Sequence, residues 1–186
     1  MAQTSGFFNA VKEGDVYDRV YLAEDFADAM SSFIDTGVLD RANDDLKVNA
    51  QAIADMTVAV NPGRAWLNGY WYHNSEIENL TINPPDGVLG RIDAIVVRWS
   101  DVDRETKLVV VEGTAASTPV KPTPTRDINN WDIILAYITL QKNSTTITSD
   151  MIEDTRNDDT VCGMIANANL IGPLSDNDVD EATPLT

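Results

Sequence analysis

Hydrophobic positions in the first fifth of the chain recur with the spacing of a helix. Within residues 22–36, LAEDFADAMSSFIDT, apolar side chains follow one another at spacings of four, four and three: Leu22, Phe26, Met30 (or Ala29) and Phe33. Side chains at these spacings lie on one side of an α-helix, and Gly37 suits a helix C-cap. We therefore predict one helix over residues 22–36.

The segment before this helix, residues 1–20, combines glycine and acidic residues with bulky apolar side chains. These include Phe7, Phe8, Val16 and Tyr17, with Tyr21 directly after the segment. Such a composition is typical of an ordered arm, and we expect its aromatic rings to dock elsewhere on the protein.

From about residue 46 onwards, the hydrophobic pattern changes to short alternating or β-branched runs. The predicted strands are LKVNAQ (46–51), MTVAV (56–60), EIENLTIN (76–83), RIDAIVVRWS (91–100), KLVVVEGTA (107–115) and WDIILAYITLQ (131–141). DVDRET at 101–106 joins two of these runs as a hairpin loop. A brief helical turn capped by Ser149 or Asp150 is predicted near the end of this region.

Three prolines within residues 117–126 break this pattern, and they predict an extended crossover that covers a sheet edge without pairing, or a strap onto a neighbouring chain. The fold class that follows is α+β, mainly β: an antiparallel, sandwich-like domain preceded by an N-terminal helical segment. We place the arm and helix at 1–45, the β domain at 46–172, and an acidic, flexible tail at 173–186.

Residues 61–74, NPGRAWLNGYWYHN, predict a further hairpin that is closed on Asn68-Gly69, a strong signal for a two-residue turn. If these two residues form the turn, Trp66 lies opposite Trp71, and strand alternation separates two faces. Arg64, Trp66, Trp71 and His73 share one face, and Ala65, Leu67, Tyr70 and Tyr72 share the other.

Both faces are apolar enough to favour cover, either in the core or at a subunit contact. A sugar-binding platform needs one face open to water, and it remains as the alternative. The residues that would form the interface or the ligand site are Trp66, Tyr70, Trp71 and Tyr72.

The net charge of −17 disfavours partners that are themselves anionic, such as nucleic acids and lipid headgroups. The single cysteine, Cys162, excludes an intrachain disulfide and is expected to be a buried thiol. No secretory signal or membrane-spanning run is present, so we expect a soluble protein that is made in a cytoplasm.

The sequence contains few of the residues from which catalytic and metal sites are built. His73 is the only histidine, and no GxSxG or phosphate-binding glycine motif occurs. One cysteine and one histidine are too few for a typical zinc site, which needs about four ligands. The run from Asp176 to Asp180 imitates the start of a calcium loop but has Glu181 where the loop needs glycine. We expect no enzyme activity, no cofactor and no metal.

Several pieces of the chain, taken in order, resemble tail-tip and baseplate proteins of tailed phages and prophages, chiefly those of Gram-positive hosts. They are SGFFNAVKEGDVYDRVYLAEDFADAMSSFIDTGVL, VNPGRAWLNGYWYHN, GRIDAIVVRWSDVDRETKLVVVEGTAASTPVKPTPTR, IILAYITLQKNSTTIT and MIEDTRND. Together they cover roughly residues 5–162, and the order and spacing are more distinctive than any single piece.

The resemblance implies a structural role in the virion, in which the module attaches the host-recognition apparatus to the tail. It implies copies of itself, with a trimer favoured, and other tail proteins as partners. Relatives often continue into receptor-binding regions, whereas this chain ends at Thr186, so we expect that head to be absent or on another protein. Binding of host surface polysaccharide through the aromatic hairpin is the alternative function.

Overall fold

A computed structural model describes residues 5–40, 44–85 and 87–166 of the chain. Its elements are β1 (Lys12–Glu13), β2 (Val16–Tyr17), α1 (Ala23–Ser31), β3 (Gly37–Asp40), β4 (Val48–Ala50), β5 (Thr57–Val60), β6 (Gly63–Leu67), β7 (Tyr70–Asn74), β8 (Glu78–Thr81), β9 (Arg91–Ser100), β10 (Glu105–Val111), β11 (Asn130–Leu140), η1 (Ser149–Met151), β12 (Ile152–Asp154) and β13 (Met164–Ala166). The fold is mainly β with one α-helix, which confirms the predicted fold class.

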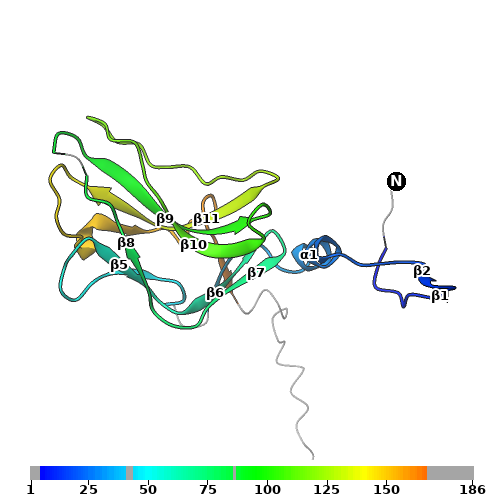
Figure 1. The fold of residues 1–186 in the computed structure, drawn as a ribbon. Coiled ribbons are helices and arrows are strands. Elements are labelled where there is room, and N and C mark those ends of the chain that lie inside the picture. Colours follow the sequence, from blue (N-terminus) through cyan, green and yellow to red (C-terminus); the bar gives the residue numbers. More distant parts are fainter. Residues whose placement is uncertain (1–4, 41–43, 86, 167–186) are drawn as a thin grey trace, which may run out of the picture.

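Three sheets build the β body (Figure 1). Their strand orders are β10-β9-β11-β12, β13-β3-β6-β7 and β4-β5-β8. Nearly all pairs are antiparallel, but β13 runs parallel to β3, with Met164 beside Val38. Because β3 belongs to this body, the body begins at residue 37 and so includes part of the 1–45 segment.

The core lies between the inner faces of these sheets. Ile95, Ile133 and Leu135 from the long strands have no exposed surface, and they pack with Val38 and Leu67 from the sheet that contains the hairpin. A register shift between Ile134 and Ala136 marks a β-bulge in β11, the strand that carries much of this core.

The proline-rich segment packs against its own chain, as the predicted internal crossover does. It covers the outer face of the β10-β9-β11-β12 sheet, where Ala94, Val96 and Tyr137 form a smaller apolar cluster. The Tyr137 hydroxyl donates a hydrogen bond of 3.0 Å to the Pro122 carbonyl, and the Lys121 ammonium lies 4.9 Å from the centre of the Tyr137 ring. The crossover thus gives the central strand β11 cover on both of its faces.

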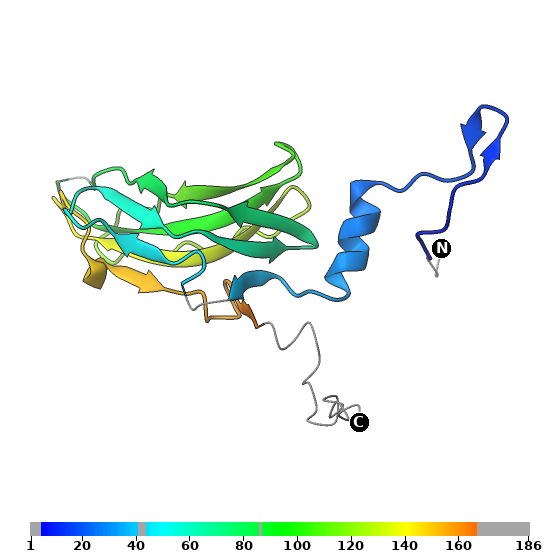
Figure 2. The ribbon, with the colours of Figure 1, turned by 90° about the horizontal axis from the view of Figure 1, so that it is seen from below.

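The N-terminal segment, by contrast, projects from one end of the β body (Figures 1 and 2). We call residues 5–36 the projection; it contains the short β1–β2 hairpin and α1. The predicted helix forms, and the Asp25 carboxylate accepts a hydrogen bond of 2.7 Å from the Leu22 backbone amide at its start. It ends at Ser32, so the expectation that Gly37 caps it is wrong; Gly37 begins β3 instead.

Most of the large apolar side chains of the projection are not covered by the β body. Phe26 is 50% exposed and Phe33 is 75% exposed, whereas Ala27 on the other side of α1 is buried. Phe7 stacks on Phe26 with ring centres 4.9 Å apart, but Phe8, Val16 and Tyr17 are exposed. Phe7 also lies against the Tyr21 ring, with centres 5.4 Å apart, so the ring contacts of the arm aromatics among the described residues are local ones within the projection.

Smaller predictions can also be compared with the structure. The turn near residue 150 is η1, but its N-cap is Thr148 and not Ser149 or Asp150. Cys162 is buried as expected. The predicted tail at 173–186 and the calcium-like run at 176–180 lie outside the described residues. Within the described parts, no helix has both the length and the hydrophobicity to cross a bilayer.

Candidate functional site

The predicted hairpin forms strands β6 and β7 with the expected register. Trp66 lies opposite Trp71, and Leu67 lies opposite Tyr70. Asn68 and Gly69 have φ values of 49° and 84°, so both turn residues are left-handed, as a type I′ turn requires. The sequence therefore predicted the geometry of this hairpin down to its pairing.

The two faces of the hairpin have different environments. Ala65 and Leu67 on one face have no exposed surface, and they belong to the core. On the opposite face Arg64 and His73 are exposed, Trp66 is half-buried, and Trp71 is 64% exposed. In the single chain the opposing sheet therefore covers one face only, and the expected cover of the tryptophan face at a subunit contact stays a prediction.

The hairpin tip meets α1. A side chain on Gly69 would place its Cβ 2.0 Å from the carbonyl oxygen of Ala27, so glycine is required for this close approach as well as for the turn. The Asn68 backbone amide donates a hydrogen bond of 3.1 Å to the Thr36 hydroxyl in the linker that follows α1. These contacts fix the middle of α1 and the linker after it against the hairpin tip.

At this junction lies a depression of about 370 Å³ that we call the rim pocket. Its walls come from the start of α1, the start of β7 and the β9–β10 turn, at the end of the β body nearest α1 (Figure 1). The lining residues are Ala23, Glu24, Tyr70, Trp71, Trp99, Ser100, Asp101, Arg104, Glu105 and Thr106. Of the four predicted site residues, Tyr70 and Trp71 line it, and Trp66 and Tyr72 do not.

The floor of the rim pocket is held rigidly. The rings of Tyr70 and Trp99 stack with centres 4.9 Å apart and join the two sheets at the end of the core. Next to Trp99 on β9, the Arg98 guanidinium donates hydrogen bonds of 2.7 and 2.8 Å to the buried carboxylate of Asp132 on β11. This bidentate pair fixes β9 against β11, and with them the position of the Trp99 ring.

Carboxylates surround the hydroxyl end of Tyr70. Burial raises the pKa of this hydroxyl, and the negative charges of Glu24 and Asp101 raise it further. Burial, with a smaller effect of Glu78, raises the pKa of Tyr72 to about 12. Both phenols therefore stay protonated at neutral pH.

Three solvent-exposed charged side chains around the rim pocket lack a partner among the residues that the structure describes. Within the described residues, Glu24, Asp101 and Arg104 make no side-chain hydrogen bond or ion pair, whereas the neighbouring Glu105 pairs with Lys107. Sequence reasoning missed Trp99, Asp101 and Arg104 as members of this site. Arg104 has a left-handed backbone, with φ of 56°, in the β9–β10 turn. That this turn lies beside the hairpin follows only from the tertiary fold.

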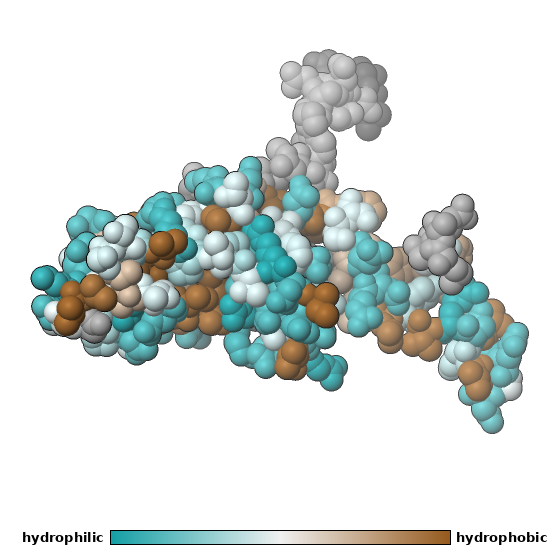
Figure 3. Space-filling model, turned by 90° about the horizontal axis from the view of Figure 1, so that it is seen from above, coloured by the Kyte–Doolittle hydropathy of each residue, from teal (hydrophilic) through white to brown (hydrophobic). Residues whose placement is uncertain are grey.

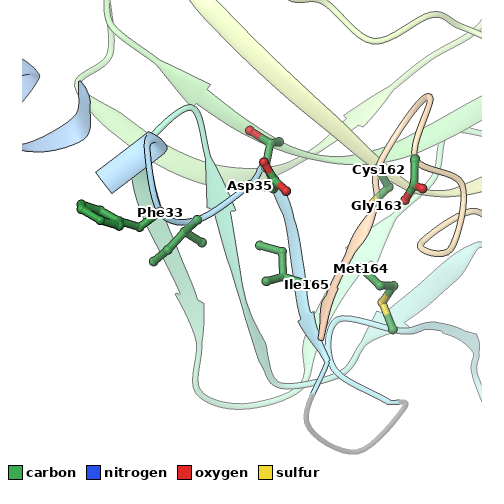
Figure 4. A pocket seen from close by; sticks show the side chains of 9 residues that line it. Phe33, Asp35, Cys162, Gly163, Met164 and Ile165 are labelled. Carbon is green, nitrogen blue, oxygen red and sulfur yellow. The ribbon is translucent and has the colours of Figure 1, made fainter. Parts of the chain in front are cut away.

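A second depression of about 590 Å³ lies between the linker after α1 and residues 159–165 (Figure 4). It is lined by Phe33, Asp35, Cys162 and Ile165 among others. Burial raises the pKa of the Cys162 thiol to about 12, so this group is protonated and a poor nucleophile. In the described parts of the chain no three His, Cys, Asp or Glu side chains group closely enough to hold a metal ion.

Comparison with protein-family models, with curated proteins and with solved structures finds no match for this chain. Its function is therefore argued from the surfaces that the fold presents.

Proposed function

We propose that this protein is a structural component of a phage or prophage tail tip or baseplate, and that it assembles with copies of itself through the projection. The observation that carries the proposal is the distribution of exposed apolar side chains. Among the described residues, nine of the sixteen large hydrophobic side chains that are exposed lie between Phe7 and Phe33, and seven lie in the rest of the chain.

The projection cannot bury these side chains by itself. A helix of nine residues is too short to be stable in water on its own propensity, and its stability depends on the packing of an apolar side. Leu22, Phe26 and Phe33 are each at least half exposed, and Figure 3 shows apolar atoms along this part of the molecule. An apolar surface of this kind is typical of a protein that associates.

A second copy of the chain suits this surface. The projection carries the acidic residues Glu13, Asp15, Asp18, Glu24, Asp25, Asp28 and Asp35 against Lys12 and Arg19 only. When helices bundle with their apolar sides inward, such charges point outward to water and limit further aggregation. We propose a trimer, because the resembled tail proteins assemble with threefold or sixfold symmetry.

The first test is the mass of the purified chain in solution by size-exclusion chromatography with light scattering. We expect three times the chain mass of 20.4 kDa. Replacing Phe26 and Phe33 together by serine should shift the particle to monomer, because both side chains lie in the proposed contact. The matched control is Ile128→Ser, which changes a side chain that is 87% exposed outside the projection and should leave the trimer intact.

A strict monomer at high micromolar concentration contradicts self-association. The role in the virion needs a separate test: immunogold labelling of tail particles produced from the genome that encodes the chain. We expect label at the distal end of the tail. Label elsewhere, or only on free protein, contradicts the tail-tip proposal.

A further inference from the structure

We propose that the rim pocket binds a neutral pyranose sugar, with the ring of Trp71 stacked on the apolar side of the sugar. This function is distinct from assembly, although Ala23 and Glu24 of the projection form one wall of the pocket. The inference starts from the exposure of Trp71, which is 64% exposed at the edge of a pocket instead of being covered by the chain.

The size and lining of the rim pocket suit a small polar ligand. Its volume of about 370 Å³ lies at the lower end of the usual range for small-molecule sites, about 300–1,000 Å³. Such sites combine apolar and aromatic walls with a few polar groups that fix the orientation of the ligand. Here the aromatic wall is Trp71 beside the Tyr70–Trp99 stack, and the polar groups are Glu24, Asp101 and Arg104.

The unpaired polar groups define which donors and acceptors the ligand must bring. Glu24 and Asp101 carry carboxylate oxygens that accept hydrogen bonds, and Arg104 only donates. Neither carboxylate has a donor among the described residues. A sugar hydroxyl can donate to a carboxylate and accept from a guanidinium, so several hydroxyls on one ring satisfy all three side chains.

The charge of the rim pocket argues against anionic ligands. Glu24, Asp101 and Glu105 outnumber Arg104, and the whole chain carries a net charge of −17. A phosphate or a nucleotide would therefore meet repulsion. Arg104 in the wall opposes a cationic ligand, and the Tyr70 and Trp99 rings, which stack on each other, offer it no free face between them. Choline in the titration below tests whether the exposed Trp71 ring and the surrounding carboxylates bind a cation instead.

The rim pocket is also preorganised. The Tyr70–Trp99 stack, the Arg98–Asp132 pair and the contact between Gly69 and α1 hold its three walls in place without a ligand. A ligand that enters therefore does not have to order the backbone around it, which favours binding even for a small contact area.

The test is a titration of the full chain with glucose, galactose, N-acetylglucosamine and rhamnose. Saturation-transfer NMR and tryptophan fluorescence measure the binding of each sugar. We expect saturable binding of at least one sugar in the millimolar range. Trp71→Ala should weaken that binding about tenfold or more, because aromatic anchors dominate small contact surfaces. Asp101→Ala and Glu24→Ala should each weaken it several-fold by removing an acceptor.

The matched control is Trp66→Ala, which removes the ring opposite Trp71 on the same hairpin face but does not change a lining residue. Its sugar affinity should stay within about twofold of the unmodified chain, and circular dichroism should report both variants as folded. Three results overturn the proposal: no saturable binding of any of the four sugars, equal affinity in Trp71→Ala, or tighter binding of glycerol phosphate or choline than of the sugars.

This test also separates the sugar site from assembly. Loss of sugar binding in Trp71→Ala should leave the light-scattering mass unchanged, and the Phe26 and Phe33 double variant should keep its sugar affinity. If the sugars bind only to the monomer, Trp71 is an interface residue, and the proposal of a free sugar site is wrong.

Discussion

The β body and the projection are built from similar proportions of apolar residues but use them in opposite ways. In the body, β-branched side chains such as Ile95 and Ile133 lose all contact with water between sheets. In the projection, Phe26 and Phe33 remain at least half exposed although they follow a helical repeat. Periodicity identifies the side of an element that is apolar, but it does not say whether the cover comes from the same chain.

The largest expected difference between the two regions lies in their contribution to stability. Leu135→Ala removes a side chain with no exposed surface and should lower the free energy of unfolding by about 2–5 kcal/mol. Phe33→Ala changes a residue that is 75% exposed and should alter the same quantity by no more than about 0.5 kcal/mol. Urea unfolding of both variants, followed by circular dichroism at low protein concentration, measures the difference. Equal losses would mean that the projection is packed as firmly as the body.

The next comparison tests the contact that joins the two regions. Gly69→Ala introduces a methyl group at φ of 84° and 2.0 Å from the Ala27 carbonyl oxygen, so it should cost about 1–3 kcal/mol and release α1 from the hairpin tip. The matched control is Gly14→Ala in the β1–β2 turn, with φ of 65° and no atom within 4 Å of the new Cβ.

The hydrogen-exchange rates of the backbone amides in residues 27–34 measure the release of α1 from the hairpin tip. The rates should rise in Gly69→Ala and stay unchanged in Gly14→Ala. Unchanged rates in both variants would mean that α1 does not depend on the hairpin for its position.

The smallest effect at pH 10 and below, about 1.4 kcal/mol, is the pH dependence of stability at Cys162, beside the linker after α1. Burial raises the pKa of this thiol from 9.0 to about 12 in the folded chain. As the pH rises past 9, the unfolded chain releases this proton while the folded chain keeps it. The stability that the protonated thiol contributes is therefore complete below pH 9 and declines toward pH 12, with a slope of at most about 1.4 kcal/mol per pH unit.

Cys162→Ala should remove this component of the alkaline decline, which is measured as the difference between the two urea unfolding curves at each pH. Tyr72, with a pKa of about 12, contributes to the decline of both proteins and cancels in the difference. Maleimide should label native Cys162 far more slowly at pH 8 than it labels the unfolded chain. Equal labelling rates would mean that this junction opens freely.

The sequence was most informative where local chemistry decides the structure. Asn68-Gly69 determines the turn, and the turn determines that Trp66 lies opposite Trp71. The long strands β9 and β11 were also predicted within a residue or so, because they are buried on both sides and read as continuous β-branched runs.

Relations between distant segments were not predictable in the same way. The rim pocket combines Glu24, Trp71 and Asp101, which are separated by dozens of residues and meet only because two sheets end at the same place. Alternation predicted the two faces of the hairpin, but it did not show which of them the opposing sheet covers. The cap of η1 was misplaced by one residue, since Ser149, Asp150 and Thr148 are all competent caps.

The parallel pairing of β13 with β3 has a consequence for how the chain is made. β3 leaves the ribosome more than a hundred residues before Met164, so until residues 164–166 emerge its only strand neighbour among the described residues is β6. One edge of the sheet that carries the hairpin therefore stays open during elongation and can pair with strands of other nascent chains. This edge can close only after residues 164–166 have been made, and we expect slow translation of residues 130–163 to raise the fraction of misassembled chains.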